Sequence, residues 1–278
     1  MKIDYRMLME EGERVARRAG AMIRSKIGHV AVHEKGPADL VTEADIASQE
    51  LVREMLAGMH PDHRLIGEED AATPGTPAAW ITSGNTAEAA AAKSGFVWIV
   101  DPIDGTTNYA HGVPLYCVSL ALAHDGDLVV GIVYDPNQDE CFTAARGAGA
   151  FLNGHPIRSS RVVDLEDALC ALSFPAHVQR SDSDVLCFME LIGRTQSIRR
   201  TGSAALNLAY VAAGRFDAAS AYRTKIWDFA AGTVLVREAG GVITTWSGEP
   251  ITLCHTPHIA AATPELAETL LVCTRRFP

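Results

Sequence analysis

The sequence has no long apolar run. None of its 278 residues belongs to a stretch of the roughly 18 apolar residues that a membrane-spanning helix needs. The first residues, Met1 to Arg6, also lack the apolar core of a signal peptide. We therefore expect a cytoplasmic protein without a membrane partner. Hydrophobic residues still make up 47% of the chain, which is enough for the sizeable core of a globular protein.

An excess of basic residues is also missing. The chain has 24 Lys and Arg against 34 Asp and Glu, and its formal net charge is −10. This balance argues against nonspecific binding to nucleic acid or to an anionic membrane, because both need a basic surface. An acidic protein that handles a phosphate ester must supply positive charge locally, and a bound metal ion is one way to do so.

Several sequence motifs are absent too. The six cysteines include no Cys-x-x-Cys pair, and most lie in apolar runs, so we expect reduced thiols in the core. The lack of Gly-x-x-x-x-Gly-Lys-Ser/Thr excludes a P-loop nucleotidase. Neither His-Glu-x-x-His nor the nucleophile elbow Gly-x-Ser-x-Gly occurs. The cysteines are Cys117, Cys141, Cys170, Cys187, Cys254 and Cys273.

The most informative stretch that is present runs from Asp101 to Asn108, Asp-Pro-Ile-Asp-Gly-Thr-Thr-Asn. The apolar run 96–100 before it predicts a buried strand, which we expect to end at Pro102. Two carboxylates at the mouth of a buried strand are costly unless positive charge compensates them. Mg²⁺ is the expected compensator, because it prefers carboxylate and carbonyl oxygens.

Other acidic residues stand near predicted strand or helix ends. Glu68 follows a short apolar strand and Gly67, and Asp228 begins a predicted helix. Taken alone, Glu68 is also typical of a solvated run of charged residues, and Asp228 is also typical of an ordinary helix cap. If they converge with Asp101 and Asp104, the four acids would hold two or three Mg²⁺ ions, one of which activates a water.

Hydroxyl and amide groups complete the expected site. Gly105 and Thr106 supply backbone N–H groups at a predicted helix start, a natural phosphate cradle. The Thr106 hydroxyl would orient the attacking water. Asp45 either caps the helix that follows Thr42 or accepts a hydrogen bond from Thr106.

The first half of the chain, 1–156, is expected to combine two helices with an antiparallel sheet. Apolar periodicity predicts helices over 4–26 and 42–58, the second with Ile46 facing inward. Residues 71–95 predict a long loop with a short helix near 86–93, and this loop is either a mobile lid or an insertion. Residues 147–154 predict turns. The expected strands are 30–32, 65–66, 96–100, 116–123, 127–134 and 140–145.

The second half, 157–278, alternates strands with helices and therefore indicates a layered α/β arrangement. We expect the two halves, α+β and α/β, to form one compact catalytic unit. The expected strands are 168–174, 197–200, 216–222 and 242–246, and the expected helices are 183–193, 202–214, 227–240 and 264–272.

Four separated blocks together point to a known family. They are Asp39-Leu40-Val41-Thr42 with Asp45, Gly67-Glu68-Glu69, Trp98 to Asn108, and Trp227 to Gly232. In these blocks, and over nearly its whole length, the chain resembles the inositol monophosphatases. They belong to the lithium-sensitive, Mg²⁺-dependent superfamily that includes fructose-1,6-bisphosphatase and the bisphosphate nucleotidases. The resemblance implies a sugar-phosphatase fold, a layered α/β/α/β/α sandwich, and a homodimer.

The resemblance also implies roles for individual residues. The first metal would be bound by Glu68, Asp101 and the Ile103 carbonyl, and the second by Asp101, Asp104 and Asp228. A third, weaker metal would be held through waters on Glu68. The amides of Gly105 and Thr106 would bind phosphate, Thr106 with Glu68 would activate the water, and Asp45 would pair with Thr106. Ser203 and Ala204 match a family segment that contacts the substrate ring.

One departure from the family pattern concerns the substrate. Seven residues before Asp228, where inositol monophosphatases usually carry a substrate-binding Glu, this chain has Ala221. The string Lys225-Ile226-Trp227-Asp228 is similar to the corresponding segment of bisphosphate nucleotidases, whereas Thr107-Asn108 differs from their pattern. Arg223 and Lys225 therefore either contact a second phosphate or lie at the surface.

The sequence thus predicts a Mg²⁺-dependent phosphomonoesterase for myo-inositol monophosphate or a similar polyol or sugar phosphate, acting by direct attack of a metal-activated water. The alternatives on the same fold are a 3′(2′),5′-bisphosphate nucleotidase, a fructose-1,6-bisphosphatase and a histidinol-phosphatase. A non-enzymatic regulatory homologue is a further alternative. The expected partner is a small phosphorylated substrate.

Overall fold

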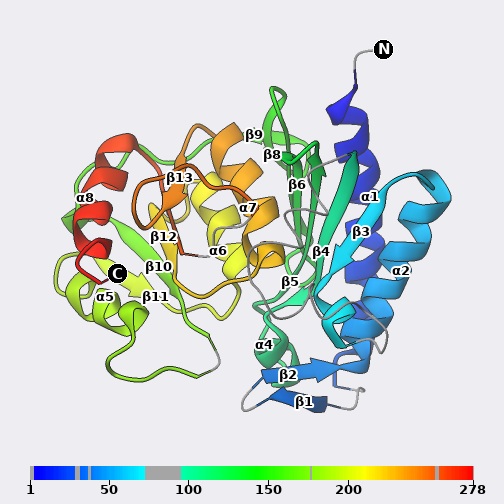
Figure 1. The fold of residues 1–278 in the computed structure, drawn as a ribbon, viewed down its shortest axis with the longest axis horizontal. Coiled ribbons are helices and arrows are strands. Elements are labelled where there is room, and N and C mark those ends of the chain that lie inside the picture. The colour runs from blue at the N-terminus through cyan, green and yellow to red at the C-terminus, as the bar shows by residue number, and fades with distance from the viewer. Residues whose placement is uncertain are drawn as a thin grey trace.

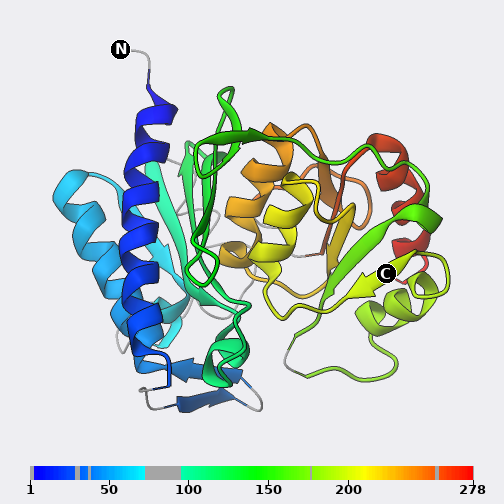
Figure 2. The same cartoon turned by 180° about the vertical axis from the view of Figure 1, so that it is seen from behind.

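The computed structural model describes residues 3–28, 32–36, 39–72, 95–175, 177–253 and 257–277. Its elements stack in five layers, which Figures 1 and 2 show from opposite sides. One outer layer holds α1 (Tyr5–Lys26) and α2 (Glu43–Met59). Between the two sheets lie α6 (Ala204–Ala212) and α7 (Ile226–Glu238), and beyond the second sheet lie α5 (Ser183–Leu191) and α8 (Pro264–Thr274). The α/β/α/β/α sandwich implied by the resemblance is confirmed.

The first sheet has seven strands in the order β3-β4-β5-β6-β7-β8-β9 among the described residues. Its β3 and β4 are parallel and all other neighbours are antiparallel. Strand β8 lies within the stretch 147–154 that was expected to form turns, and β9 follows it directly and was not expected, since short strands next to glycines carry little periodic signal. The strands are β3 (Arg64–Gly67), β4 (Phe96–Asp104), β5 (Cys117–His124), β6 (Asp127–Asp135), β7 (Glu140–Ala145), β8 (Gly149–Leu152) and β9 (His155–Ile157).

The second sheet has the order β11-β10-β12-β14-β13 in the described part of the chain. Strands β11 and β12 run parallel to β10, because helices connect them, and β14 is antiparallel to its neighbours. The sequence had not predicted β14. The strands are β10 (Leu169–Ser173), β11 (Ser197–Arg199), β12 (Ala218–Ala221), β13 (Val242–Thr245) and β14 (His258–Ala261).

The remaining described elements are short and lie outside the two sheets. A separate antiparallel pair joins β1 (Val32–Gly36) to β2 (Asp39–Thr42). A five-residue helix α4 (Thr106–Ala110) follows β4, and 3-10 turns cover Glu68–Ala72 and Leu165–Asp167. The strands of the two sheets divide between β9 and β10, and the partition of the chain into two halves at residue 156 stays a prediction.

The middle helices are apolar on nearly all sides because a sheet packs against each side of their layer. Small residues bring these elements close together. A Cβ added to Gly131 of β6 would lie 2.2 Å from the carbonyl oxygen of Ala231 in α7. A Cβ added to Gly232 would lie 2.4 Å from Cβ of Leu208 in α6. Glycine at these two positions therefore sets the thickness of the central layer.

Two expectations for the first half are wrong. Strand β4 does not end at Pro102 but continues to Asp104 through a β-bulge. Ile46 does not face inward, and its side chain is 51% exposed. The buried stripe of α2 is instead built partly from polar side chains, Asp45, Ser48 and Gln49, which all find hydrogen-bond partners.

Some other expectations concern residues that the structure does not describe. Residues 73–94, which hold most of the expected 71–95 loop and its short helix, lie outside them, as does Cys254. The remaining five cysteines are buried free thiols, as expected. Among the described residues, no helix combines the length and the apolar character needed to cross a membrane.

Candidate metal centre

The bulge in β4 explains how two aspartates three residues apart serve one site. Asp101 pairs with Ser119 of β5 and Asp104 with Cys117, so β4 has one residue more than β5 in this interval. In a regular strand, residues three apart point to opposite faces, and one inserted residue returns both to the same face. The Asp101 carboxylate also accepts the N–H of Ile103 at 3.0 Å, which fixes the bulge.

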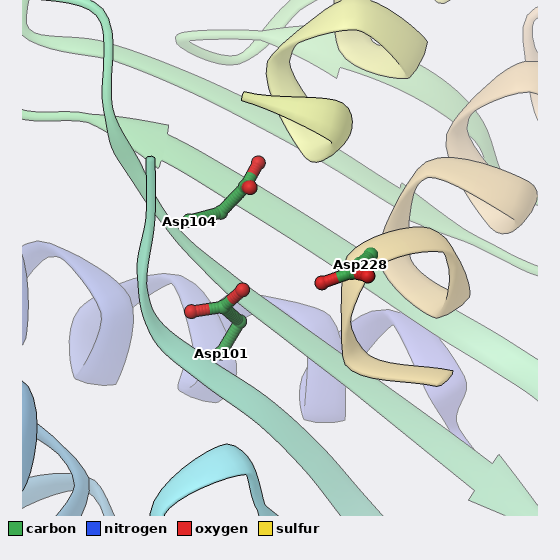
Figure 3. Close-up of side chains that lie close together, drawn as sticks. All are labelled: Asp101, Asp104 and Asp228. Atoms are coloured by element: carbon green, nitrogen blue, oxygen red, sulfur yellow. The ribbon is translucent and has the colours of Figure 1, made fainter. Parts of the chain in front are cut away.

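The third aspartate comes from the first turn of α7. Asp228 accepts the N–H of Lys225 at 2.7 Å, so it stabilises the start of α7 from the third helical position, whereas the N-cap residue is Lys225. Asp228 is also part of the cluster. One carboxylate oxygen from each of Asp101, Asp104 and Asp228 lies within 4.8 Å of the others. Figure 3 shows the three side chains converging on the space between β4 and α7.

The electrostatics of this cluster favour a cation. Burial raises the pKa of Asp101 well above its usual value, and the charges of Glu68, Asp104 and Asp228 raise it further. Burial and the charge of Asp104 likewise raise the pKa of Asp228. A divalent cation bound there would lower these pKa values again, because its positive charge offsets both the burial of the carboxylates and the repulsion between them.

Glu68 lies beside this cluster, within hydrogen-bonding reach of the Asp101 side chain. The polar residues of α2 hold the segment that follows it. Gln49 accepts the N–H of Glu69 at 2.9 Å and donates to Asp70 at 3.0 Å. Arg53 also bonds to Asp70. These contacts account for Gln49 at a buried helix position where an apolar residue would be ordinary.

Thr106 and Asp45 come together as the sequence predicted. The Thr106 hydroxyl lies 3.3 Å from a carboxylate oxygen of Asp45 and 3.1 Å from the carbonyl oxygen of Ile103. Asp45 is 1% exposed and its other oxygen accepts from both the amide and the hydroxyl of Thr42. Asp45 therefore caps α2 and orients Thr106 at the same time.

Asp104 connects β4 to the first turn of α6. It accepts the Ser203 hydroxyl at 2.5 Å, the Ala205 amide at 2.6 Å and the Ala204 amide at 3.2 Å. Burial raises the pKa of Asp104, and these donors oppose that rise. The Ser203 side chain is fully buried against Asp104, whereas Ala204 faces the neighbouring cavity.

A cavity of about 410 Å³ opens beside the acid cluster. Of the residues predicted to bind substrate, Gly105, Thr106, Ala204 and Arg223 line it, and Ser203 and Lys225 do not. Sequence reasoning missed Phe174 and Arg200. The signal available in the sequence was the basic pair Arg199-Arg200, which is separated from Gly202-Ser203 only by Thr201. The complete lining is Asp104, Gly105, Thr106, Thr107, Asn108, Ser173, Phe174, Pro175, Arg200, Gly202, Ala204, Arg223, Thr224 and Asp228.

Gly105 and Gly202 shape the wall of this cavity. Gly105 has a φ of 102°, which favours glycine, and an added Cβ would lie 2.9 Å from the Leu115 carbonyl oxygen. An added Cβ on Gly202, with a φ of +89°, would lie 2.7 Å from the Asn108 side chain. Asn108 itself donates to the carbonyls of Leu115 and Thr201, and so joins α4 to the turn before α6.

The donor set fits a hard divalent cation. The converging ligands are carboxylate oxygens, with the Ile103 carbonyl as a further candidate, and this all-oxygen set suits Mg²⁺. The described part of the chain places no imidazole or thiolate ligand in the group. Glu68, Asp101, Asp104 and Asp228 are therefore the residues that could hold the metal.

Comparison with known proteins agrees with the sequence resemblance. The sequence model of the inositol monophosphatase family matches residues 4–277. The inositol-1-monophosphatase of Rhizobium meliloti is 36% identical over 280 residues, covering 96% of each chain. The Nus factor SuhB of Pseudomonas aeruginosa is 39% identical over 264 residues, covering 93% of this chain and 92% of that protein.

A solved structure matches in fold as well. The extragenic suppressor protein suhB of Bartonella henselae superposes with a TM-score of 0.85 at 33% identity, covering 97% of this chain and 99% of the other.

Proposed function

Because this chain belongs to the inositol monophosphatase family, we propose that it is a Mg²⁺-dependent phosphomonoesterase that hydrolyses myo-inositol monophosphate or a similar polyol or sugar phosphate. The main support is the convergence of Asp101, Asp104 and Asp228 beside a cavity lined by Gly105 and Thr106. The relative named inositol-1-monophosphatase supports the substrate class.

In this proposal the acids hold the metal and the start of α4 holds the phosphate. Glu68, Asp101, Asp104, Asp228 and the Ile103 carbonyl would bind two or three Mg²⁺ ions. Bound there, Mg²⁺ would lower the pKa of a coordinated water and stabilise charge on the phosphoryl oxygens. The amides of Gly105 and Thr106 would orient the phosphate group in the cavity.

Thr106 would orient the attacking water. Its hydroxyl proton is directed to Asp45 or to the Ile103 carbonyl, so its oxygen retains lone pairs that can accept a hydrogen bond from water. Glu68 would take the proton that the water releases. The proposal includes no phosphorylated protein side chain, and direct attack by water predicts inversion at phosphorus.

The test is phosphate release with Mg²⁺ from inositol-1-phosphate, a bisphosphonucleotide, fructose-1,6-bisphosphate and histidinol phosphate. We expect Asp101→Asn to lower kcat/KM by about 1,000-fold or more, because it removes charge from the metal cluster. Asn retains an oxygen for the Ile103 amide, so the bulge should persist. The control is Asp62→Asn, which alters an exposed acid in a turn. Near-normal turnover of Asp101→Asn would refute the metal assignment.

A regulatory role without catalysis is the second candidate. The observation that favours it is the name of the Pseudomonas aeruginosa relative, Nus factor SuhB, at 39% identity. The intact Asp101, Asp104 and Asp228 cluster favours catalysis instead. Absence of Mg²⁺-dependent phosphate release across the whole substrate panel would support the regulatory role.

A further inference from the structure

We propose that the cavity beside the acid cluster has a subsite for a second anionic group of the substrate, formed by Arg200 and Arg223 on either side of Phe174. This inference rests on the proposed phosphatase function and specifies the substrate class: a phosphate ester that carries a second phosphate or another anion. All three residues line the cavity that also contains Asp104, Thr106 and Asp228.

The topology of the second sheet places these three side chains in a row. Phe174, Arg200 and Arg223 come directly after or near the ends of β10, β11 and β12. These strands are parallel neighbours in the order β11-β10-β12, so their carboxyl ends lie at one edge of the sheet. Neighbouring strands are about 4.8 Å apart, which places the two arginine strands about 10 Å apart with the phenylalanine strand between them.

Arg223 is held in position by two acids at the start of α5. Its Nη2 lies 2.6 Å from Asp182 and 3.5 Å from Asp184. The side chain of Asp184 is only 3% exposed, so this anchor is part of the folded structure and not a chance surface contact. Both ion pairs use the same nitrogen, and in the part of the chain that the structure describes no acid pairs with Nη1 or Nε, which are therefore available to another acceptor.

Arg200 has a different support. Its guanidinium lies over the ring of Phe174, 5.5 Å from the ring centroid. Among the described residues, no acidic side chain forms an ion pair with Arg200. A guanidinium stacked on an aromatic ring keeps its N–H groups free at its edge, and such a group binds phosphate or carboxylate in a bidentate manner.

The remaining surroundings are compatible with an anion. Ala221, the last residue of β12, is 3% exposed and adds no negative charge near the row. The nearby carboxylates Asp182 and Asp184 are paired with Arg223, which leaves the charge of Arg200 uncompensated locally. The cavity volume of about 410 Å³ leaves room for a substrate larger than a single phosphate group.

The experiment compares matched substrate pairs with Mg²⁺: inositol-1,4-bisphosphate with inositol-1-phosphate, fructose-1,6-bisphosphate with fructose-1-phosphate, and adenosine 3′,5′-bisphosphate with 3′-AMP. We expect at least one bisphosphate to have a kcat/KM about 10-fold above that of its partner, mainly through a lower KM, because the second anion adds charge-assisted hydrogen bonds to the arginines. A 10-fold ratio corresponds to about 1.4 kcal/mol. The pair that shows the preference identifies a polyol, sugar or nucleoside substrate.

Arg200→Gln and Arg223→Gln should each remove most of this preference, measured as the ratio of kcat/KM for the bisphosphate to kcat/KM for its monophosphate partner. Arg223→Lys, which keeps the charge facing Asp182 and Asp184, should retain part of it. The matched control is Arg199→Gln, because Arg199 is also exposed but bonds to Ser197 and to the Ile198 carbonyl and does not line the cavity. Equal kcat/KM within every pair, or an Arg199→Gln effect as large as the others, would overturn the proposal.

The subsite can also be tested if the protein has no phosphatase activity. If no substrate releases phosphate, the same pairs are compared by calorimetric binding with Mg²⁺ present. Tighter binding of a bisphosphate that is lost in Arg200→Gln and Arg223→Gln would then support the subsite without catalysis. Equal binding within every pair would refute the subsite.

Discussion

At the scale of single residues, the Thr106 hydroxyl combines two roles that substitution can separate. It contacts Asp45 and the Ile103 carbonyl, and it faces the cavity. Thr106→Val keeps the shape but removes the hydroxyl, so we expect kcat to fall by about 100-fold or more, as for other lost proton-transfer or water-orienting groups. Steady-state kinetics with Mg²⁺ on the best substrate measures this change.

The matched control for this prediction is Thr106→Ser, which keeps the hydroxyl and should retain most of kcat. Stabilisation of both variants by Mg²⁺ should equal that of the wild type, because the acid cluster is intact in each. If Thr106→Val and Thr106→Ser show the same kcat, the hydroxyl does not orient the water.

At the scale of elements, the close approach of β6 to α7 makes a strong prediction. The Cβ of Gly131→Ala would lie 2.2 Å from the Ala231 carbonyl oxygen, which is backbone and cannot rotate away. Overpacking of this kind forces the backbone to shift, so we expect a loss of about 2 kcal/mol or more in the free energy of unfolding. Urea unfolding at fixed Mg²⁺ concentration measures it.

The same substitution elsewhere provides the control. Gly58 lies in the last turn of α2, and an added Cβ would have no heavy atom within 4 Å. Gly58→Ala should therefore stabilise the protein by roughly 0.5 kcal/mol through helix propensity and chain entropy. Equal effects at Gly131 and Gly58 would show that the helix–sheet distance in the central layer is not fixed by glycine.

The elements themselves were largely predictable, because most carry a clear apolar period. The helices α1, α2 and α7 and the strands β5 to β7 fall where the sequence indicated. The bulge in β4 was not predictable, since Pro102 ordinarily ends a strand and only pairing with β5 reveals the inserted residue. Ile46 was misplaced because the buried face of α2 is polar where it supports the site.

The candidate site was predictable only where local sequence carries the signal. Acids that directly follow an apolar run, such as Asp101 and Asp104, are unusual in themselves and can be found in the sequence. Ser203 matches a substrate-contacting segment in sequence, yet only the fold shows that its hydroxyl bonds to Asp104. The row of Arg200, Phe174 and Arg223 depends on the strand order β11-β10-β12, which local sequence does not carry.

At the scale of the whole molecule, the acid cluster joins separate layers. Asp101 and Asp104 belong to a strand of the first sheet, and Asp228 belongs to a helix of the central layer. A cation that binds all three therefore favours the assembled structure over any state in which these layers separate. Ligand binding to the folded state alone adds about 2.7 kcal/mol at a concentration 100-fold above Kd.

We expect the acid cluster to destabilise the metal-free protein, because carboxylate oxygens of Asp101, Asp104 and Asp228 lie within 4.8 Å of one another and repel. Asp101→Asn removes one charge, so in EDTA we expect this variant to unfold at a Tm equal to or above that of the wild type. With saturating Mg²⁺ the order should reverse, since the wild type gains several degrees and Asp101→Asn gains little. The control variant Asp62→Asn should have the same Tm as the wild type in both buffers.

A wild-type Tm that does not respond to Mg²⁺ would contradict the proposed metal centre. A Tm of Asp101→Asn below that of the wild type in EDTA would show that the aspartate contributes packing or hydrogen bonds beyond its charge.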